Sequence, residues 1–385
     1  MTSTNPTDFA HVGPDTLAGR YLRRFWHPVY RAADLVAGRP VRLQVLNEYF
    51  TLYRGESGAV FLLVDRCPHR QTSLVHGWVE GDRIRCFYHG WVFDGAGQCV
   101  EQPAEKSSFA AKVKVCSYPV EEYMGLVFAY LGDGAAPPFP RYPEIEQAEA
   151  DIAVNRHVVP CSYFQRIEND LDETHVHFVH RVSTKSYGLD EIPQIAVRET
   201  EYGIRREGLR SGERANISRV AHIMWPNINL VDLPPAPDFP YWTVQVAWRV
   251  PQDDESSVTF SLRLLKPEPG PRAEGRKIRP GREPDPPALK LSEDILAGRM
   301  RIQDVDPNYP ALFVVEDNVA LAGQGRITDR ARDWLGQSDR GVILLRRIWE
   351  RELTALAEGK PLKEWRRPTE RMGLAVSEIT EMAAF

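Results

Sequence analysis

The sequence has no apolar run of about 18 residues and no basic segment followed by an apolar one, so it predicts neither a transmembrane helix nor a secretory leader. It also lacks an excess of basic residues. The formal net charge is -5, and acidic and basic residues are interleaved, which argues against a nucleic-acid partner. We therefore expect a soluble, unprocessed protein of the cytoplasm that binds neither nucleic acid nor membrane.

Cysteine is scarce as well. The 385 residues include only five cysteines, which are Cys67, Cys86, Cys99, Cys116 and Cys161. An odd number of cysteines in a large chain without a leader predicts free thiols instead of disulfides. Two of them belong to the motif described next, and we expect the other three to be buried. Apolar residues, by contrast, make up 43% of the chain, enough for two or three domains with cores of their own.

Two cysteines and two histidines lie close together in the sequence. Cys67-Pro-His69 is followed, after a loop, by Cys86-Phe-Tyr-His89. Such a set can bind one zinc ion or two irons of unequal electron richness. Structural zinc sites usually begin with a pair of cysteines and end with a pair of histidines, whereas here each half contributes one of each. The spacing favours a [2Fe-2S] centre with two Cys on one iron and two His on the other; a zinc ribbon, or four unconnected polar residues, is the alternative.

The residues around these four support the cluster. Gly77, Gly81 and Gly90 allow tight turns that aim backbone N–H groups at sulfur, and Trp91 follows where it could shield an iron. The motifs C-P-H-R and C-x-Y-H-G-W resemble the Rieske domain of the aromatic-ring-hydroxylating oxygenases, large subunit. The stretch VGPDTLAGRYLRRFWHPV resembles the opening of the phthalate dioxygenase branch of that family.

The first half of the chain predicts a small antiparallel β domain. Residues 14–26 predict a short helix that ends before Pro28, within an N-terminal segment, 1–37, that packs on the catalytic domain. Alternating apolar residues predict strands in two runs, 41–54 and 59–65, with a hairpin loop at 55–58 between them, and shorter runs beyond predict more strands. We expect a Rieske [2Fe-2S] domain over residues 38–140, with the cluster at the tips of two loops.

For the second half, 141–385, the resemblance implies an α+β catalytic domain with an antiparallel sheet flanked by helices, a helix-grip-like arrangement. Its β-rich runs follow one another at the spacing of an antiparallel sheet. Helices are predicted around residues 313–323 and 339–358, the second with an apolar stripe and Gly359 just past its end. Residues 267–287 hold seven prolines and three glycines, which predicts a mobile loop. The whole chain is thus of the α+β class.

Histidines and acidic residues concentrate at residues 169–180, where there are three of each. His175 and His180 are five positions apart, about 140° in azimuth on an ideal helix, so both reach one metal only if the helix distorts or ends. His177 and His180, three apart, would do so more easily. Spacing alone does not choose between these pairs.

The pattern N-x-x-D-x-x-H-x4-H, formed by Asn169, Asp172, His175 and His180, resembles the mononuclear-iron motif of the Rieske oxygenases. The resemblance implies that His175 and His180 bind iron and that His177 does not. It also implies that Asn169 and Asp172 serve catalysis without binding the metal.

The same resemblance implies a third ligand, a carboxylate far downstream. Asp317 stands in the matching helix, with Glu316 and Asn318 as rivals. Two histidines and one carboxylate leave positions open for dioxygen on Fe(II). Asp172 is expected to hydrogen-bond His175 and, across a subunit boundary, His89 of a neighbouring chain, which would carry electrons between the two metal centres.

The resemblance implies the oxygenase component of a multi-component system that uses O2 as a co-substrate. Electrons from NAD(P)H would come through a separate reductase, with or without a ferredoxin, because the chain has neither a G-x-G-x-x-G after a strand nor a plant-type ferredoxin motif. The expected reaction is mono- or dioxygenation of an aromatic compound. Oxidative O- or N-demethylation is the alternative within the family, and a Rieske electron carrier or a zinc-binding protein is the alternative outside it. A closed homotrimer, or stacked trimers, is expected.

The substrate is expected to be a small aromatic compound, with or without a carboxylate. A strand over ISRVAHIMWPNINLV should line the iron site, either with His222, Met224 and Asn227 or with Trp225 and Ile223. Several arginines lie nearby, and a buried one would bind a substrate carboxylate through two hydrogen bonds. These are Arg205, Arg206, Arg210, Arg214 and Arg219.

Overall fold

A computed structural model describes residues 5–183, 189, 191–211, 216–233, 241–267, 276–281 and 286–372. The chain divides into two compact units, Gly19–Phe139 and a second formed by Met1–Ala18 with Pro140–Phe385. The expected domain limits remain a prediction. They differ from this division in residues 19–37, which the structure groups with the first unit.

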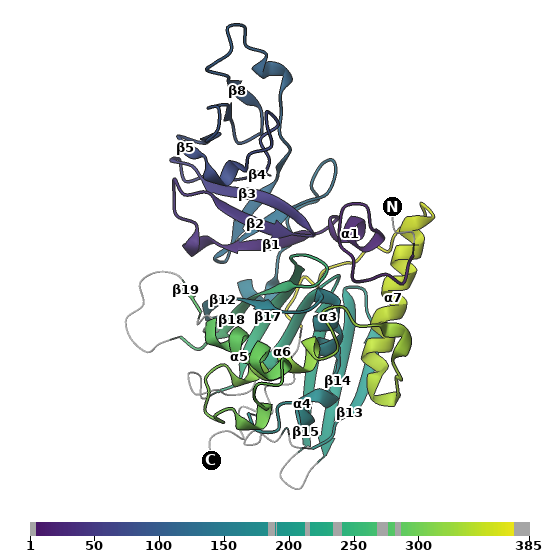
Figure 1. The fold of residues 1–385 in the computed structure, drawn as a ribbon. Coiled ribbons are helices and arrows are strands. Elements are labelled where there is room, and N and C mark those ends of the chain that lie inside the picture. The colour runs from purple at the N-terminus through teal and green to yellow at the C-terminus, as the bar shows by residue number, and fades with distance from the viewer. Residues whose placement is uncertain are drawn as a thin grey trace. The chain divides into compact units, whose positions relative to one another are not determined.

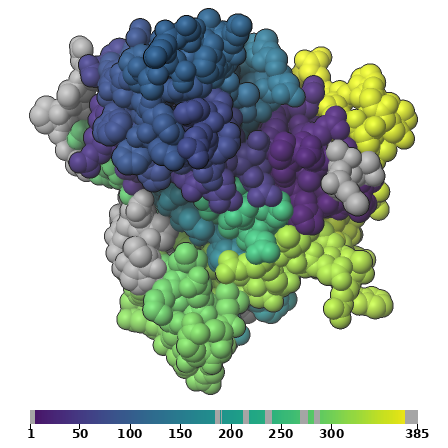
Figure 2. Space-filling view, turned by 45° about the horizontal axis from the view of Figure 1, so that its top comes forward, coloured from purple at the N-terminus to yellow at the C-terminus, as the bar shows by residue number. Residues whose placement is uncertain are grey.

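The unit Gly19–Phe139 consists of three small antiparallel sheets (Figure 1). In the space-filling view the blue residues of this unit form a rounded surface (Figure 2). The first sheet has the order β1 (Trp26–Arg31), β11 (Leu126–Tyr130), β10 (Val120–Tyr123). The second has β2 (Val41–Val45), β3 (Glu48–Arg54), β4 (Val60–Val64), β9 (Ser117–Tyr118). The third has β5 (Trp78–Glu80), β6 (Arg83–Arg85), β7 (Val92–Phe93), β8 (Cys99–Glu101).

The helix expected over residues 14–26 is shorter in the structure. Helix α1 spans Leu17–Leu22, and the prediction is wrong for the last residues because Trp26 already begins β1. Strand β1 is an edge strand, and its register shifts between Pro28 and Tyr30. An edge position tolerates a proline, which has no N–H to give to the sheet. Pro28 therefore lies within a strand and does not mark the end of a helix.

The second unit is built on an antiparallel sheet of eight strands, with one short parallel strand at an edge (Figure 1). In sheet order the strands are β13 (Gln194–Glu199), β14 (Gly203–Ser211), β15 (Asn216–Met224), β16 (Ile228–Leu233), β17 (Thr243–Pro251), β18 (Ser257–Leu265), β12 (Asp151–Val159) and β19 (Ile278–Pro280). The helices are α2 (Pro143–Glu146), α3 (Tyr163–Leu171), α4 (Thr174–Phe178), α5 (Pro286–Leu296), α6 (Leu312–Ala322) and α7 (Arg340–Ala357).

Three expectations change in detail. The loop expected over 267–287 includes β19, and α5 begins at its end; residues 268–275 and 282–285 lie outside the described residues. The sequence did not predict α5. All five cysteines are free, as expected, but Cys116 is exposed, so the prediction of a buried thiol is wrong there.

In the part of the chain that the structure describes, no helix combines the length and apolar character needed to cross a membrane.

Candidate metal centres

The two cysteines of the first motif meet in the interior of the Gly19–Phe139 unit. Cys67 precedes β5 and Cys86 follows β6, and both are buried in a core that includes Leu74 and Ile84. A hydrogen bond from Cys67 lowers the pKa of Cys86 to about 6 and raises that of Cys67. Backbone N–H groups of Tyr88 and His89 also favour the Cys86 thiolate. The lowered pKa and the backbone N–H groups suit a thiolate ligand at Cys86.

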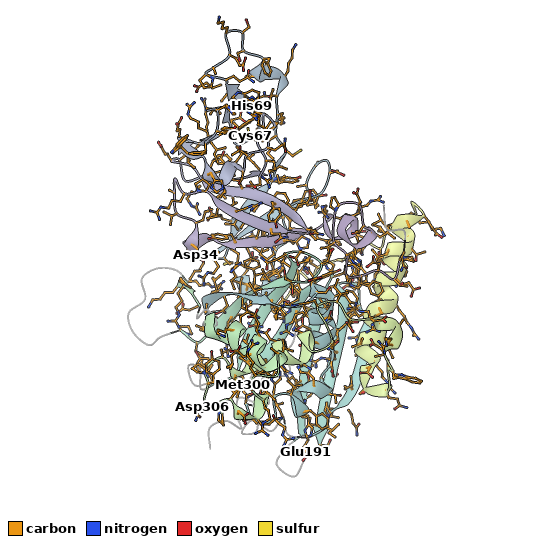
Figure 3. All side chains as sticks on the ribbon, viewed as in Figure 1. Asp34, Cys67, His69, Glu191, Met300 and Asp306 are labelled. Carbon is orange, nitrogen blue, oxygen red and sulfur yellow. The ribbon has the colours of Figure 1, made fainter. Side chains whose placement is uncertain are left out.

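The two histidines of the motif lie beside each other. Their ring centroids are 4.4 Å apart, and His69 stacks on Trp91 with an interplanar angle of 6°. Figure 3 labels Cys67 and His69 in the loop region of this unit. Nδ1 of His69 is buried and, among the described residues, has no hydrogen-bond partner. An orphaned ring nitrogen is expected at a metal ligand, because a buried imidazole otherwise pairs. The four residues therefore fit a [2Fe-2S] cluster.

Two glycines make the tight turns here. Gly90 has φ +71°, a left-handed conformation that side chains rarely adopt, and its N–H donates to the Cys86 carbonyl at 3.0 Å. A Cβ on Gly77 would lie 2.3 Å from the carbonyl oxygen of Arg85. Both cluster loops thus depend on positions where only glycine fits.

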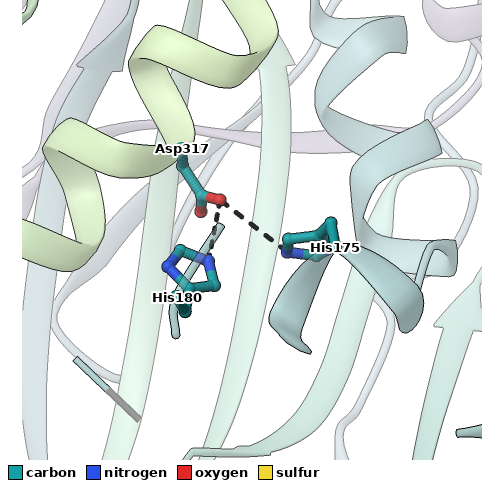
Figure 4. A group of neighbouring side chains, drawn as sticks. All are labelled: His175, His180 and Asp317. Carbon is teal, nitrogen blue, oxygen red and sulfur yellow. Dashed lines mark hydrogen bonds and ion pairs between the residues drawn. The ribbon is translucent and has the colours of Figure 1, made fainter. Parts of the chain in front are cut away.

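In the second unit, the structure brings His175, His180 and Asp317 together (Figure 4). One ligand atom from each lies within 4.8 Å of the others. Asp317 Oδ1 is 3.1 Å from His180 Nε2 and 3.8 Å from His175 Nε2. Ligands at right angles around an ion, with bonds of about 2.1 Å, would lie about 3 Å apart. The spacing and the two-nitrogen, one-oxygen donor set therefore fit a mononuclear iron.

The end of helix α4 lets the two histidines converge. The five-residue α4 runs from Thr174 to Phe178, so His175 lies within the helix and His180 lies beyond its end. The azimuth of an ideal helix therefore does not keep this pair apart. His177 packs against Phe178 and is not in the group of three.

His175 is oriented by the backbone of Asp172, whereas the sequence predicted its carboxylate. The ring Nδ1 donates to the Asp172 carbonyl, which leaves Nε2 for a metal. The Asp172 carboxylate instead accepts the backbone N–H groups of Thr174, at 2.9 Å, and His175, at 3.2 Å. These N–H groups open α4 and have no partner within the helix, so a nearby carboxylate competes well for them. Of the described residues, none donates to its Oδ2.

The carboxylates of α6 have different partners. Glu316 faces Nδ1 of His180, on the side of the ring away from Asp317. Asn318 donates to Ser292 on α5. Burial disfavours a charge on Asp317, but Arg166, 3.4 Å from its Oδ2, and His180 together lower the pKa of Asp317 far below its usual range. Asp317 is thus the carboxylate of α6 that lies between both histidines.

The expected substrate strand is two strands, β15 and β16. Side chains alternate between faces along a strand, so Arg219 and Ile223 share the face on which Arg219 contacts Glu173, two residues before His175. His222 and Met224 lie on the opposite face. Of the two alternatives, this favours the one that contains Ile223.

The other two candidates in these strands have partners of their own. Trp225 stacks on Trp365, with ring centroids 4.7 Å apart. Asn227 donates to the Arg249 carbonyl at 2.8 Å. Their role in substrate binding remains a prediction.

Three of the five predicted arginines are buried, and the carboxylate that they bind is the chain's own Glu173. Arg205 lies on the opposite face and pairs with Glu207, and Arg214 lies outside the described residues. The three buried ones are Arg206, Arg210 and Arg219.

The sequence pattern assigns no role to His157 or Arg166, although both lie near the three candidate ligands. His157 pairs with Thr259 across β18, and Thr259 pairs with Arg249, whose side chain reaches Asp170 on α3. Paired residues share a face, so His157 faces the side of the sheet on which α3 lies. Burial, with Arg249 and Arg166, lowers the pKa of His157 to about 3, which keeps the ring neutral. Neither residue has a spacing signal: His157 reaches this face through strand register, and Arg166 on α3 meets Asp317 on α6 only through tertiary packing.

Comparisons with known proteins identify the family of the chain. Residues 25–123 match the family model described as "Rieske [2Fe-2S] domain". The chain is 32% identical over 384 residues to the 5,5'-dehydrodivanillate O-demethylase oxygenase subunit of Sphingobium sp. (strain NBRC 103272 / SYK-6), covering 94% of this chain and 83% of that protein. It is 32% identical over 372 residues to the phenoxybenzoate dioxygenase subunit alpha of Ectopseudomonas oleovorans, covering 90% and 84%.

A solved structure supports the fold at lower identity. The reduced complex between oxygenase and ferredoxin in carbazole 1,9a-dioxygenase contains a chain that superposes with a TM-score of 0.62 at 20% identity. The match covers 92% of this chain and 95% of that one.

Proposed function

The chain belongs to the Rieske non-haem iron oxygenases as an oxygenase subunit, and from this premise we propose that it hydroxylates an aromatic substrate at an iron held by His175, His180 and Asp317. The observation that carries the proposal is the convergence of these three side chains, within 4.8 Å, in the second unit. We further propose that Cys67, His69, Cys86 and His89 hold the cluster in the first unit.

As a member of this family, the protein is the oxygenase component of a multi-component system, with a Rieske [2Fe-2S] cluster and a mononuclear iron as cofactors. The cluster supplies electrons, and the mononuclear Fe(II) activates O2. NAD(P)H is the source of the electrons, through a separate reductase. We infer that these partners meet in the cytoplasm, where NAD(P)H is available.

The chain's own residues prepare the iron site. The Asp172 carbonyl holds His175 and the Glu316 carboxylate holds His180, each through Nδ1, so both Nε2 atoms point to the same place. Arg166 pairs with Asp317 Oδ2 and leaves Oδ1 facing the histidines. These contacts would present two imidazole nitrogens and one carboxylate oxygen to a metal ion.

We propose that the substrate is an aromatic acid. The support is the name of the phenoxybenzoate dioxygenase, which denotes a carboxylate-bearing ring. Arg206, Arg210 and Arg219 are already paired with Glu173, so we infer that other groups on the α3 side of the sheet bind the substrate carboxylate. His157 is one candidate, because it faces that side as a neutral donor. A turnover screen of benzoates against the corresponding amides tests this: amides that react as well as the acids would contradict it.

O-demethylation is the second candidate reaction. It is favoured by the similarity to the dehydrodivanillate O-demethylase subunit over 94% of this chain. Hydroxylation of an O-methyl carbon gives a hemiacetal-like product that collapses and releases formaldehyde. Formaldehyde formed from methoxybenzoates, with no hydroxylated ring product, would select this reaction.

We also propose that the oxygenase assembles as a homotrimer or as stacked trimers, and that a ferredoxin delivers the electrons. The two metal motifs lie in separate units of one chain, so a head-to-tail ring could bring the cluster of one subunit to the iron of the next. A ferredoxin is bound to the oxygenase in the carbazole 1,9a-dioxygenase complex. Full activity in monomers would contradict the ring.

The decisive test of the ligand assignment is a pair of variants. His180→Ala should lose the mononuclear iron and all turnover while the visible spectrum of the cluster persists. Cys86→Ser should bleach the cluster and leave the mononuclear iron in place. Loss of the cluster spectrum in His180→Ala would contradict two independent sites.

A further inference from the structure

Glu173 occupies the break between the two helices of the iron motif. Helix α3 ends at Leu171 and α4 begins at Thr174, so Glu173 lies immediately before the segment that carries His175. Its side chain is 0% exposed. A buried carboxylate requires hydrogen-bonding and charged partners, because the interior does not solvate it.

Three arginines hold this carboxylate from the sheet. Arg210 Nη1 donates to Oε1 at 2.7 Å, and Arg219 Nη1 donates to Oε2 at 2.8 Å. Arg206 donates to Oε2 as well. Arg206 and Arg210 flank Gly208 on one face of β14, and Gly208 pairs with Arg219 on β15. A Cβ on Gly208 would lie 2.6 Å from Cγ of Glu173, so this glycine provides the space for the glutamate.

The same contacts reach the backbone next to His175. Arg210 Nη2 also lies 3.4 Å from the Glu173 carbonyl, to which it donates. The peptide unit that joins Asp172 to Glu173 contains the Asp172 carbonyl, which accepts from His175 Nδ1. When Glu173 is fixed, the direction of that carbonyl is fixed, and with it the ring of His175. Helix α4 has five residues and is too short to hold the ring by itself.

We propose that Arg206, Arg210 and Arg219 act through Glu173 as a positioning device for His175, so that the iron-binding geometry of this histidine is set from the central sheet. The inference rests on the proposed role of His175 as an iron ligand. If these ion pairs only stabilised the fold, breaking them would lower the stability of the protein. It would not change the iron site more than breaking other buried ion pairs does. This difference makes the two roles distinguishable.

The test compares Glu173→Gln with a matched control, Glu168→Gln, in the full-length protein with its cluster. Glu168 is also a buried glutamate held by arginines, Arg330 and Arg346, but its side chain does not lie in the break before His175. A second variant, Gly208→Ala, displaces Glu173 without changing any charge. Each protein is depleted of mononuclear iron and titrated with Fe(II). The EPR signal of its nitric oxide adduct then reports the ligand geometry, and cluster absorbance reports folding.

Glu173→Gln and Gly208→Ala should weaken Fe(II) binding about 10- to 100-fold and alter the EPR signal. Glu168→Gln should lower the melting temperature without weakening Fe(II) binding or altering the EPR signal. If Glu173→Gln fails to fold, the same measurements on Gly208→Ala test the proposal. Wild-type Fe(II) affinity and EPR signal in the folded test variants would overturn the proposal, as would equal weakening in Glu168→Gln.

A third variant, His175→Ala, separates this inference from the proposed function. Iron retained in His175→Ala would remove that residue from the ligand set and the proposal with it. Iron lost there but bound normally in Glu173→Gln would leave the ligand assignment standing and sink the positioning role alone.

Discussion

Nδ1 of His180 lies 2.8 Å from Oε2 of Glu316, while Nε2 of the same ring faces Asp317 at 3.1 Å. The imidazole is thus held between two neighbouring residues of α6. Ser183 donates to the same oxygen of Glu316 at 2.8 Å, so this carboxylate is fixed as well. A carboxylate on the far nitrogen of a metal-binding histidine fixes its tautomer and raises its basicity. Glu316 is therefore placed to support a ligand.

Glu316→Gln should weaken Fe(II) binding about 10- to 100-fold without abolishing it, because the amide keeps the shape but loses the charge. Asp317→Asn, which changes the group between both histidines, should lose the iron completely. Iron content relative to cluster sulfide measures both effects. If Glu316→Gln lost all iron and Asp317→Asn kept it, the assignment of the third ligand would be reversed.

The sequence alone cannot choose between these two carboxylates. Adjacent residues on a helix differ by about 100° in azimuth, so the packing of α6 decides which one faces His180. The two metal motifs could be predicted from the sequence because the residues of each motif are close together in the chain. The predicted α+β class is confirmed by the comparisons. The cluster of arginines around Glu173 could not be predicted from the sequence, because these arginines meet only through the register of β14 with β15.

Turn chemistry explains the misplaced strand boundaries. The sequence predicted one β-rich run over residues 41–54. In the structure, Leu46 and Asn47 adopt positive φ and divide this run into the two strands β2 and β3. Leucine carries no turn signal, so the hairpin was not visible. The helix α5 was missed because it begins beside a proline-rich segment, whose composition dominated the prediction.

A buried histidine outside the metal sites predicts acid sensitivity. His27 is fully buried, and burial lowers its pKa to about 4 from the ordinary 6.5. The folded state therefore holds the ring neutral, and the stability from this residue is complete above pH 6.5 and is lost as the pH falls towards 4. The difference between the ordinary pKa and the pKa in the folded state corresponds to about 3 kcal/mol of unfolding free energy.

Denaturant unfolding of wild type and of His27→Gln, between pH 7 and 4, measures this contribution. The wild-type free energy of unfolding should fall by more than that of the variant, by up to about 3 kcal/mol. Parallel pH profiles for the two proteins would show that His27 is not the group responsible.

Asp172→Asn tests the electron route. The amide oxygen can still accept the N–H groups of Thr174 and His175, and the Asp172 carbonyl that orients His175 is unchanged, so both metals should bind normally. The charge and one acceptor oxygen are lost, and with them the expected link to His89 of a neighbouring chain. We expect the reduced cluster to re-oxidise at least about tenfold more slowly, in stopped-flow absorbance with substrate and O2. Re-oxidation at the wild-type rate would place the route elsewhere, and missing mononuclear iron would make Asp172 a ligand.

Electron transfer between subunits predicts complementation between two inactive variants. Cys86→Ser keeps the iron site and lacks the cluster, whereas His180→Ala keeps the cluster and lacks the iron. In rings formed from equal amounts of both, half of the subunits have an iron site, and half of those receive a neighbour with a cluster. Mixed assemblies from co-expression should therefore regain about a quarter of the wild-type activity. The same proteins purified separately and mixed without exchange of subunits serve as the control and should stay inactive. If mixed rings were verified after co-expression and were also inactive, electrons would have to pass within one chain. A head-to-tail ring would then not be needed for electron transfer.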